Sequence, residues 1–458
     1  MPAPEVRGPQ SPVVEERAVL KPSAPAEGVF AVVGGTLLLG TGERIEGGTI
    51  VVRDGIIEAV GESSSVSVPE GARTFEARGR FVTPGIVDTH SHMGVYPSPH
   101  VEAHADGNEM TDPTTPYVFS EHGFWPQDPA LQAAVVGGVT TIQVLPGSGN
   151  VIGGRSTVLK LRPRREARAM RFPNAPQGIK MACGENPKRV YGSKGRQPMS
   201  RMGNAFTLRQ AFIQAREYRF ARDLYEDEFA EWKKKRDAFA EDPEAPKPGP
   251  EPKSPKRDLG METLAAVLDG ELRADEMLQV LSLGDELGFE VSTFHHAIEA
   301  YKIADVLAER GVHAAVWADW WGFKLEAYDT TEANAGIIAA AGGLPNIHSD
   351  SENGVQRLNQ EAAKALTAGR RLGLDLDEDD AITWITKNPA AALGIEDRTG
   401  TLEAGKMADV VVWDRSPLSV YAKTDLVFID GDLVFDRGRP DPRWSDFLVG
   451  TEVEETQP

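Results

Sequence analysis

The central part of the sequence alternates short Val- and Ile-rich runs with segments of helical periodicity, and this alternation constrains the fold more than any other feature. Such alternation predicts parallel strands joined by crossover helices. Eight such units close a barrel, with the functional groups at the carboxyl ends of its strands. The sequence therefore predicts an α/β protein with a TIM-like barrel, and seven of its strands can be counted: Phe81–Val87, Thr140–Leu145, Thr157–Leu161, Gly178–Cys183, Phe289–Phe294, His313–Trp317 and Leu344–Ile347.

Both ends of the sequence instead have the pattern of β-structure. Residues 29–60 contain short strands, and the Arg53-Asp54-Gly55 turn between them is typical of a hairpin. Residues 399–419 and 426–438 have the same character. We expect residues 29–80 and 400–450 to form a small β domain, and residues 81–399 to form the barrel.

Three other segments lie outside this pattern. Residues 1–28 are rich in Pro, Glu and Ala and lack an apolar signal region, so we interpret them as a flexible arm. Residues 203–240 have helical spacing with many charges, which predicts a long, mostly exposed helix. The Pro-rich residues 241–258 suit a surface insertion. The lack of a signal favours the cytoplasm by default, and export with the signal already removed is the alternative.

Charge and cysteine content narrow the classes of partner. The 69 acidic and 49 basic residues give a net charge of −20, which repels phosphate backbones and anionic lipid. No run of about 18 apolar residues predicts a membrane span. The single cysteine, Cys183, excludes a Cys-rich zinc cluster and suits a small core residue. We therefore expect a small-molecule ligand, no nucleic-acid or membrane partner, and leave open a homo-oligomer.

A histidine pair follows the first predicted barrel strand. His90 and His92 lie in the segment FVTPGIVDTHSHMG, which covers residues 81–94. Side chains at i and i+2 of a strand point the same way, so both imidazoles can face one metal ion. Neutral imidazole nitrogens are good ligands for zinc and similar divalent ions.

Two segments resemble the metal-dependent amidohydrolase superfamily, most closely its imidazolonepropionase-like and Xaa-Pro-dipeptidase-like branch. They are PGIVDTHSH at residues 84–92 and GTLEAGKMADVVVWD at residues 400–414, and the resemblance extends over about residues 29–438. It implies a distorted (β/α)8 barrel flanked by a β-sandwich made from both termini. It also implies one or two divalent ions, with zinc expected, and hydrolysis of carbon–nitrogen bonds in amides, cyclic amides or dipeptides by a metal-activated water.

The resemblance further implies metal ligands on strands six and eight. On strand six, His295 and His296 are adjacent and point to opposite faces. We prefer His296 as the ligand, with His295 in a packing or supporting role and as the alternate. On strand eight, Asp350 matches the catalytic aspartate that takes the proton from water and passes it to the leaving nitrogen. His348 lies two residues earlier, and we expect it in the core or behind the ligands.

The resemblance also implies a metal ligand or a bridge between two ions on strand four, where the sequence offers two candidates. Glu185 is preferred because it lies past the strand end and needs no modification, whereas Lys180 can bridge only if it is carboxylated. A surface ion pair of Glu185 with Lys188 or Arg189 is the alternative.

The remaining aromatic and histidine residues give weaker signals. Trp317, Trp320 and Trp321 follow strand seven and suit either a substrate pocket or hydrophobic packing. Three other histidines, His100, His104 and His122, lie in the loop expected over the barrel mouth. His313 starts a strand, at the end opposite to the one where catalytic groups lie.

The resemblance also implies a histidine on strand five, between the strand at residues 178–183 and the strand at residues 289–294, and this histidine is missing. Residues 261–288 have the pattern of two helices with nothing strand-like between them, as though a segment were deleted between Leu272 and Arg273. Glu271 is a candidate to fill part of the vacancy. The gap raises an alternative function, a non-catalytic ligand-binding relative. A lyase or isomerase on the same scaffold is a third, weaker idea.

Overall fold

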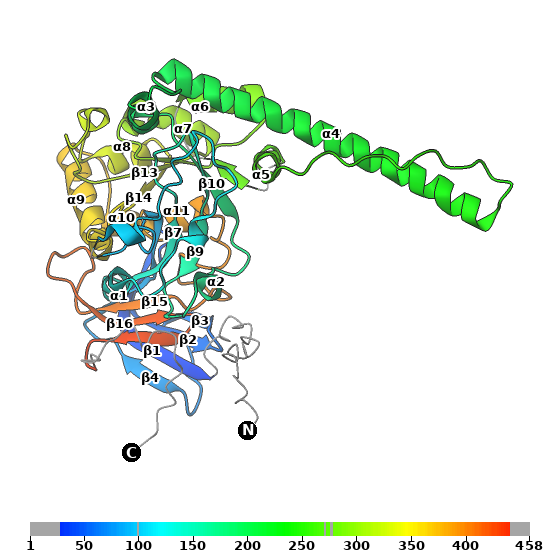
Figure 1. Cartoon of the computed structure of the whole chain (residues 1–458). Coiled ribbons are helices and arrows are strands. Elements are labelled where there is room, and N and C mark those ends of the chain that lie inside the picture. Colours follow the sequence, from blue (N-terminus) through cyan, green and yellow to red (C-terminus); the bar gives the residue numbers. More distant parts are fainter. Residues whose placement is uncertain (1–27, 99, 270–271, 275–277, 440–458) are drawn as a thin grey trace, which may run out of the picture.

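A computed structural model describes residues 28–98, 100–269, 272–274 and 278–439. An eight-stranded sheet lies at one end of the body, the helix-covered barrel region lies above it, and one long helix projects from the barrel region (Figure 1). All but the last residue of the arm expected at residues 1–28 lies outside the described residues, as do Glu271 and the end of the expected β domain, residues 440–450.

Strands from both ends of the chain form the eight-stranded sheet. Its order is β17-β16-β15-β5-β1-β2-β3, and β4 pairs with β1. The two ends meet where β15 runs antiparallel to β5. The bounds of the strands are β1 Val29–Leu38, β2 Arg44–Arg53, β3 Ile56–Glu62, β4 Arg73–Glu76, β5 Phe81–Pro84, β15 Val410–Trp413, β16 Thr424–Ile429 and β17 Asp432–Asp436.

The predicted hairpin at Asp54 and Gly55 is confirmed, because β2 and β3 are antiparallel neighbours joined at these two residues. Their φ angles are 49° and 79°. A two-residue turn with both φ angles positive matches the twist of the strands that it joins. Phe30, Phe75 and Phe428 pack ring against ring in the core of this sheet and hold the two chain ends together.

Three smaller sheets make up the barrel region. Their orders are β6-β7-β9, β8-β10-β11 and β12-β13-β14. Parallel pairs join β6 to β7, β10 to β11, β12 to β13 and β13 to β14. The bounds are β6 Ile86–Ser91, β7 Val139–Val144, β8 Ile152–Arg155, β9 Thr157–Lys160, β10 Gln177–Met181, β11 Leu272–Ala274, β12 Thr293–His295, β13 His313–Val316 and β14 Leu344–Ile347.

The single strand predicted over Phe81–Val87 is two strands. β5 belongs to the eight-stranded sheet and β6 to the barrel region, and the chain passes from one to the other at Gly85. A Cβ atom on Gly85 would lie 2.1 Å from the hydroxyl oxygen of Thr140 on β7. Only glycine lets the backbone pass this close to β7, and this crossing starts β6 on its course toward the histidine pair.

Two further predictions about strands were wrong. β9 runs antiparallel to β7, because residues 145–156 include β8 and leave no room for a crossover helix. Residues 272–274 do form a strand, β11, which pairs in parallel with β10 through Gln177 and Leu272. With three residues β11 is too short to show a strand pattern in the sequence, and it contains no histidine.

Helices follow the barrel strands, and some of them begin at a residue whose side chain caps them. The Asp128 side chain accepts the backbone N–H of Ala130 at the start of α1, and Asp258 accepts those of Gly260 and Met261 at the start of α5. The α-helix bounds are α1 Pro129–Val136, α2 Ala167–Met170, α3 Glu185–Gly192, α4 Arg201–Glu241, α5 Leu259–Leu268, α6 Leu278–Leu287, α7 Ala304–Arg310, α8 Asn334–Ala340, α9 Leu358–Arg371, α10 Glu378–Thr383 and α11 Lys387–Ala392. Short 3-10 helices cover Glu102–His104, Ser120–His122, Ala300–Ile303, Leu325–Ala327 and Val355–Arg357.

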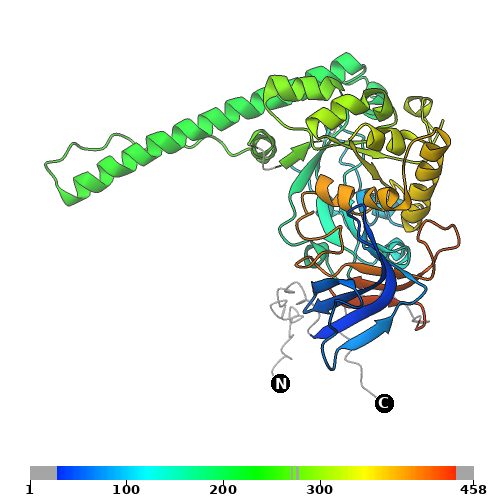
Figure 2. The same ribbon diagram turned by 180° about the vertical axis from the view of Figure 1, so that it is seen from behind.

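The long exposed helix predicted over residues 203–240 is confirmed as α4, which has 41 residues. Its buried residues lie between Asn204 and Ala215, and the rest of the helix projects from the body (Figure 2). The segment after α4 runs back beside it, and the indole N–H of Trp232 donates to the carbonyl of Gly249 at 2.9 Å.

A buried charge network fastens the barrel region to the eight-stranded sheet. The Lys160 ammonium on β9 donates to Asp409, before β15, at 2.9 Å and also to Asp430, after β16. Asp409 also accepts the Thr399 hydroxyl at 2.7 Å and the Asp430 backbone N–H at 3.1 Å. The ammonium therefore compensates two carboxylates at the junction of the two parts.

Replacing Lys160 with methionine removes the cation that pairs with Asp409 and leaves Asp430 with Arg162 alone. Breaking a buried ion pair from one side costs about 3–5 kcal/mol, and we expect the free energy of unfolding in urea to fall by about that amount. Lys234→Met is the matched control, because Lys234 and its partner Glu231 are exposed and such pairs contribute little to stability. Equal stabilities of the two variants would contradict the structural role of the network.

Candidate metal centre

His90 lies at the carboxyl end of β6 and is held there by Asp88. The Asp88 carboxylate accepts the backbone N–H groups of His90 at 3.1 Å and Ser349 at 3.2 Å, and it also accepts the Ser349 hydroxyl. Ser349 follows β14, so these bonds tie the ends of β6 and β14 together. Burial raises the pKa of Asp88 to about 6 against the effect of these donors.

Three ligand atoms meet at the end of β6. His90 Nε2 lies 3.3 Å from His92 Nε2 and 3.3 Å from Asp350 Oδ1, and His92 Nε2 lies 3.2 Å from the same oxygen. Atoms bound tetrahedrally to zinc at about 2.0 Å lie about 3.3 Å from one another. The three side chains therefore have the spacing of one face of a tetrahedral zinc site.

The protonation of the imidazoles also fits metal binding. Nδ1 of His92 lies 2.9 Å from the carbonyl oxygen of Leu145 and donates to it, so Nε2 is the nitrogen that faces the other two ligand atoms. Burial, followed by the charge of Lys180, lowers the pKa of His90 well below its usual value. Burial is also the largest cause that lowers the pKa of His296. These rings are neutral, as metal ligands must be.

Asp350 supplies the negative charge of the cluster. Burial alone would raise its pKa, but the interactions with His296 and His92 outweigh burial and lower it below the usual range. Its backbone N–H donates to the His90 carbonyl at 3.0 Å, and its Oδ2 lies 3.8 Å from His296 Nε2. Asp350 and His296 both have left-handed backbones, with φ of 50° and 53°. Such conformations are uncommon outside glycine and often occur at functional sites.

The structure separates the two strand-four candidates. Lys180 is buried on β10, and its charge helps to lower the pKa values of His90 and His296, after burial itself. Glu185 begins α3, where its backbone N–H donates to Glu326 Oε1 at 2.7 Å. Among the described residues, neither group of three side chains that could hold a metal ion includes Glu185.

The adjacent histidines at the end of β12 both lie near His90. The His296 ring is 4.4 Å from the His90 ring and the His295 ring is 4.7 Å from it, between centroids. His296 Nε2 also faces the Asp350 carboxylate, whereas the groups of candidate ligands among the described residues do not include His295.

Two of the three tryptophans form a stack on the cluster. The buried Trp317 ring lies 4.5 Å from the His296 ring with 21° between the planes, and Trp320 stacks on Trp317 at 5.0 Å. Trp321 does not join this stack: it is 64% exposed, and its indole N–H donates to the Tyr328 carbonyl at 2.9 Å.

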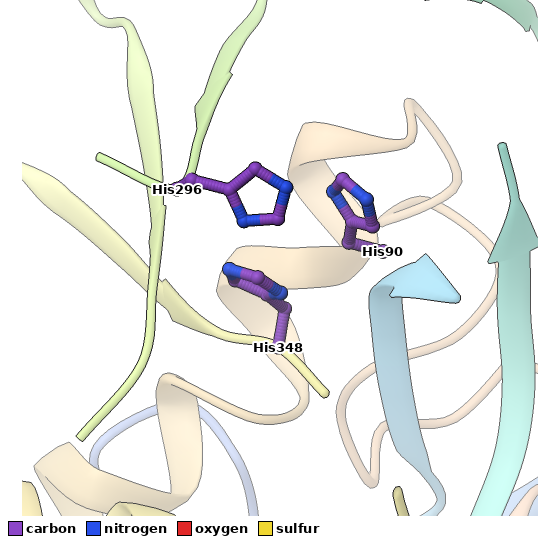
Figure 3. A group of neighbouring side chains, drawn as sticks. All are labelled: His90, His296 and His348. Atoms are coloured by element: carbon purple, nitrogen blue, oxygen red, sulfur yellow. The ribbon is translucent and has the colours of Figure 1, made fainter. Parts of the chain in front are cut away.

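The sequence analysis placed His348 in the core or behind the ligands, and the structure places it in the core beside two of the candidate ligands. Its ring lies 5.1 Å from the rings of both His90 and His296, and the three form a second group that could hold a metal ion (Figure 3). The available signal was its position two residues before Asp350 at the same strand end. His104 instead packs against Trp125, with ring centroids 4.8 Å apart, and His313 begins β13.

The raised pKa of Asp88 predicts how stability depends on pH. The folded protein keeps a proton near pH 5 that the unfolded chain releases, so the Asp88 contribution is full below about pH 4 and is lost as pH rises through about 6. We expect urea unfolding without metal to show that the stability of the wild type over Asp88→Asn falls by about 3 kcal/mol across this window. A constant difference between the two proteins from pH 4 to pH 7 would contradict the assignment.

Comparisons with known proteins agree with this geometry. The model of the amidohydrolase family matches residues 294–436. Amidohydrolase tasK of Hapsidospora irregularis is 34% identical over 411 residues, which are 85% of this chain, and this chain spans only 40% of that protein. An imidazolonepropionase of Mesorhizobium japonicum is 25% identical over 416 residues, which are 81% of this chain and 87% of that protein.

A solved structure gives the strongest support for the family. An amidohydrolase from Thermotoga maritima of known crystal structure has 33% sequence identity to this chain and a TM-score of 0.75. The match covers 89% of this chain and 100% of the Thermotoga chain. The comparisons confirm a TIM-barrel-like α/β fold and do not favour a non-catalytic ligand-binding protein. No helix among the described residues is long and apolar enough to span a bilayer. The predicted resemblance is confirmed, and the chain belongs to the amidohydrolase family, whose members hydrolyse carbon–nitrogen bonds.

Proposed function

We propose that this protein is a metal-dependent hydrolase of carbon–nitrogen bonds in small amides, cyclic amides or dipeptides. The tetrahedral spacing of His90, His92 and Asp350 is the observation that carries the proposal. This group lies where a TIM-like barrel places its catalytic side chains, at the carboxyl ends of the strands. Family membership supports the class of bond.

The proposed ligands of a divalent ion, with zinc expected, are His90, His92, His296 and Asp350. Three of them are imidazoles and one is a carboxylate, a donor set that suits zinc. Lys180 replaces Glu185 as the strand-four residue of the proposal, because its charge reaches His90 and His296. It would bridge two ions only as a carboxylated lysine.

The chain's own residues would bind the substrate and move its proton. A bound divalent ion supplies a Lewis acid that lowers the pKa of a coordinated water to about 7. Asp350 is anionic and lies beside the imidazoles, so its carboxylate can accept a proton from the attacking water and return it to the leaving nitrogen. Trp317 and Trp320 would form one apolar wall for the substrate.

Two substitutions separate metal binding from proton transfer. His90→Ala should lose both zinc and activity, because His90 belongs to both groups of candidate ligands. Asp350→Asn should lower kcat by about 10²–10⁴-fold, the usual contribution of a general base, while retaining part of the zinc. Zinc is measured by inductively coupled plasma mass spectrometry, and rates are measured on zinc-loaded protein with a panel of small amides, cyclic amides and dipeptides.

His122→Ala is the control, because His122 is an exposed histidine on the loop after β6. It should keep the zinc content and rates of the wild type. A metal-free protein as active as the zinc-loaded one, or His90→Ala with unchanged zinc, would overturn the proposed function.

A further inference from the structure

The His348 imidazole is buried without a protein partner for its polar atoms. Its residue is 1% exposed, and within the described part of the chain neither ring nitrogen has a hydrogen-bond partner. Buried polar side chains are almost always hydrogen-bonded, and one that is not needs a reason. Other imidazoles lie beside this ring, so the unpartnered nitrogens indicate that a bound metal ion is the partner of one of them.

The neighbours of His348 are themselves candidate ligands. One nitrogen from each of His90, His296 and His348 lies within 4.8 Å of the others. Nδ1 of His90 and Nδ1 of His296 also have no hydrogen-bond partner among the described side chains. The three rings come from β6 and from the residues that follow β12 and β14, and they surround one common space (Figure 3).

The same region lacks an imidazole from the neighbouring strand. The strand before β12 in the chain is β11, whose residues Leu272, Arg273 and Ala274 offer none. Asp350 does not take the place of this imidazole with its carboxylate, because it already faces His90 and His92. His348 is the further imidazole that the described chain brings to His296.

We propose that His348 is a metal ligand that completes, with His296 and His90, the position for which β11 offers no imidazole. This inference rests on the proposed metal-dependent function. His90 belongs to this group and to the group with His92 and Asp350, so the two are adjacent positions of one centre. In this proposal a histidine that follows strand eight (β14) replaces the histidine that strand five (β11) does not supply.

Loss of the imidazole should weaken metal binding directly. Substitution of a residue that supports a metal ligand lowers metal affinity by about 10–100-fold. Loss of a ligand itself should cost more, so we expect His348→Gln to weaken zinc binding by at least about 100-fold or to lose one equivalent of zinc. Zinc affinity is measured by competition with a chromophoric chelator, and zinc content by mass spectrometry. His313→Gln is the matched control, a buried histidine at the start of β13, and it should bind zinc like the wild type.

A gain of signal keeps the test decisive if His348→Gln folds poorly. In His348→Cys a ligating thiolate should give Co(II)-substituted protein a sulfur-to-cobalt charge-transfer band in the near ultraviolet, because thiolates are good ligands for such ions. The wild type, with Cys183, and His313→Cys should lack the band. Such a band requires the side chain at position 348 to coordinate the ion, and a purely structural histidine would not produce it.

The results also separate this inference from the proposed function. If His90→Ala loses zinc while His348→Gln keeps the wild-type affinity and His348→Cys shows no band, then His348 is not a ligand and the proposed function stands. If the wild type binds no zinc at all, both are overturned. Weakened zinc binding in His348→Gln together with the band in His348→Cys would support both.

Discussion

The hydrogen bonds between Ser349 and Asp88 hold the candidate centre together. They join the end of β14 to β6, and the Asp350 N–H adds a third bond to the His90 carbonyl. Because strand ends are joined here, the carboxylate of Asp350 lies against the nitrogens of His90 and His92. Positive φ angles at His296 and Asp350 then set the direction of both residues at the turns after their strands. These two residues thus adopt uncommon backbone conformations, and the candidate ligands are held in a preorganised group.

The sequence was enough to single out the first candidate ligands. His90 and His92 could be proposed because residues i and i+2 of one strand share a face, and Asp350 because it matches the catalytic aspartate of the family that the chain resembles. Lys180 and His348 could not be ranked this way. Their importance depends on which strands are neighbours and on which nitrogens lack partners, and both are tertiary facts. Glu185 was preferred as the strand-four ligand because it lies past the end of the strand, and the sequence did not show that it begins α3.

The fold shows the same division. Alternation of strands and helices predicted the α/β class, and heavy charge with helical spacing predicted α4. The break at Gly85 was hidden because the same apolar run serves two sheets. The direction of β9 depends on a short connection, and β11 is too short for any periodicity to show. Pairing of β5 with β15 joins segments more than 300 residues apart, so no local pattern reports its register.

The most direct test of the candidate centre is the position of the ion itself. Crystals of the protein grown with zinc, with data collected on both sides of the zinc absorption edge, locate the metal by anomalous scattering. We expect a peak about 2.0 Å from Nε2 of both His90 and His92 and from a carboxylate oxygen of Asp350. Zinc-replete crystals with no anomalous peak among these three side chains would contradict the metal centre on which the proposed function depends.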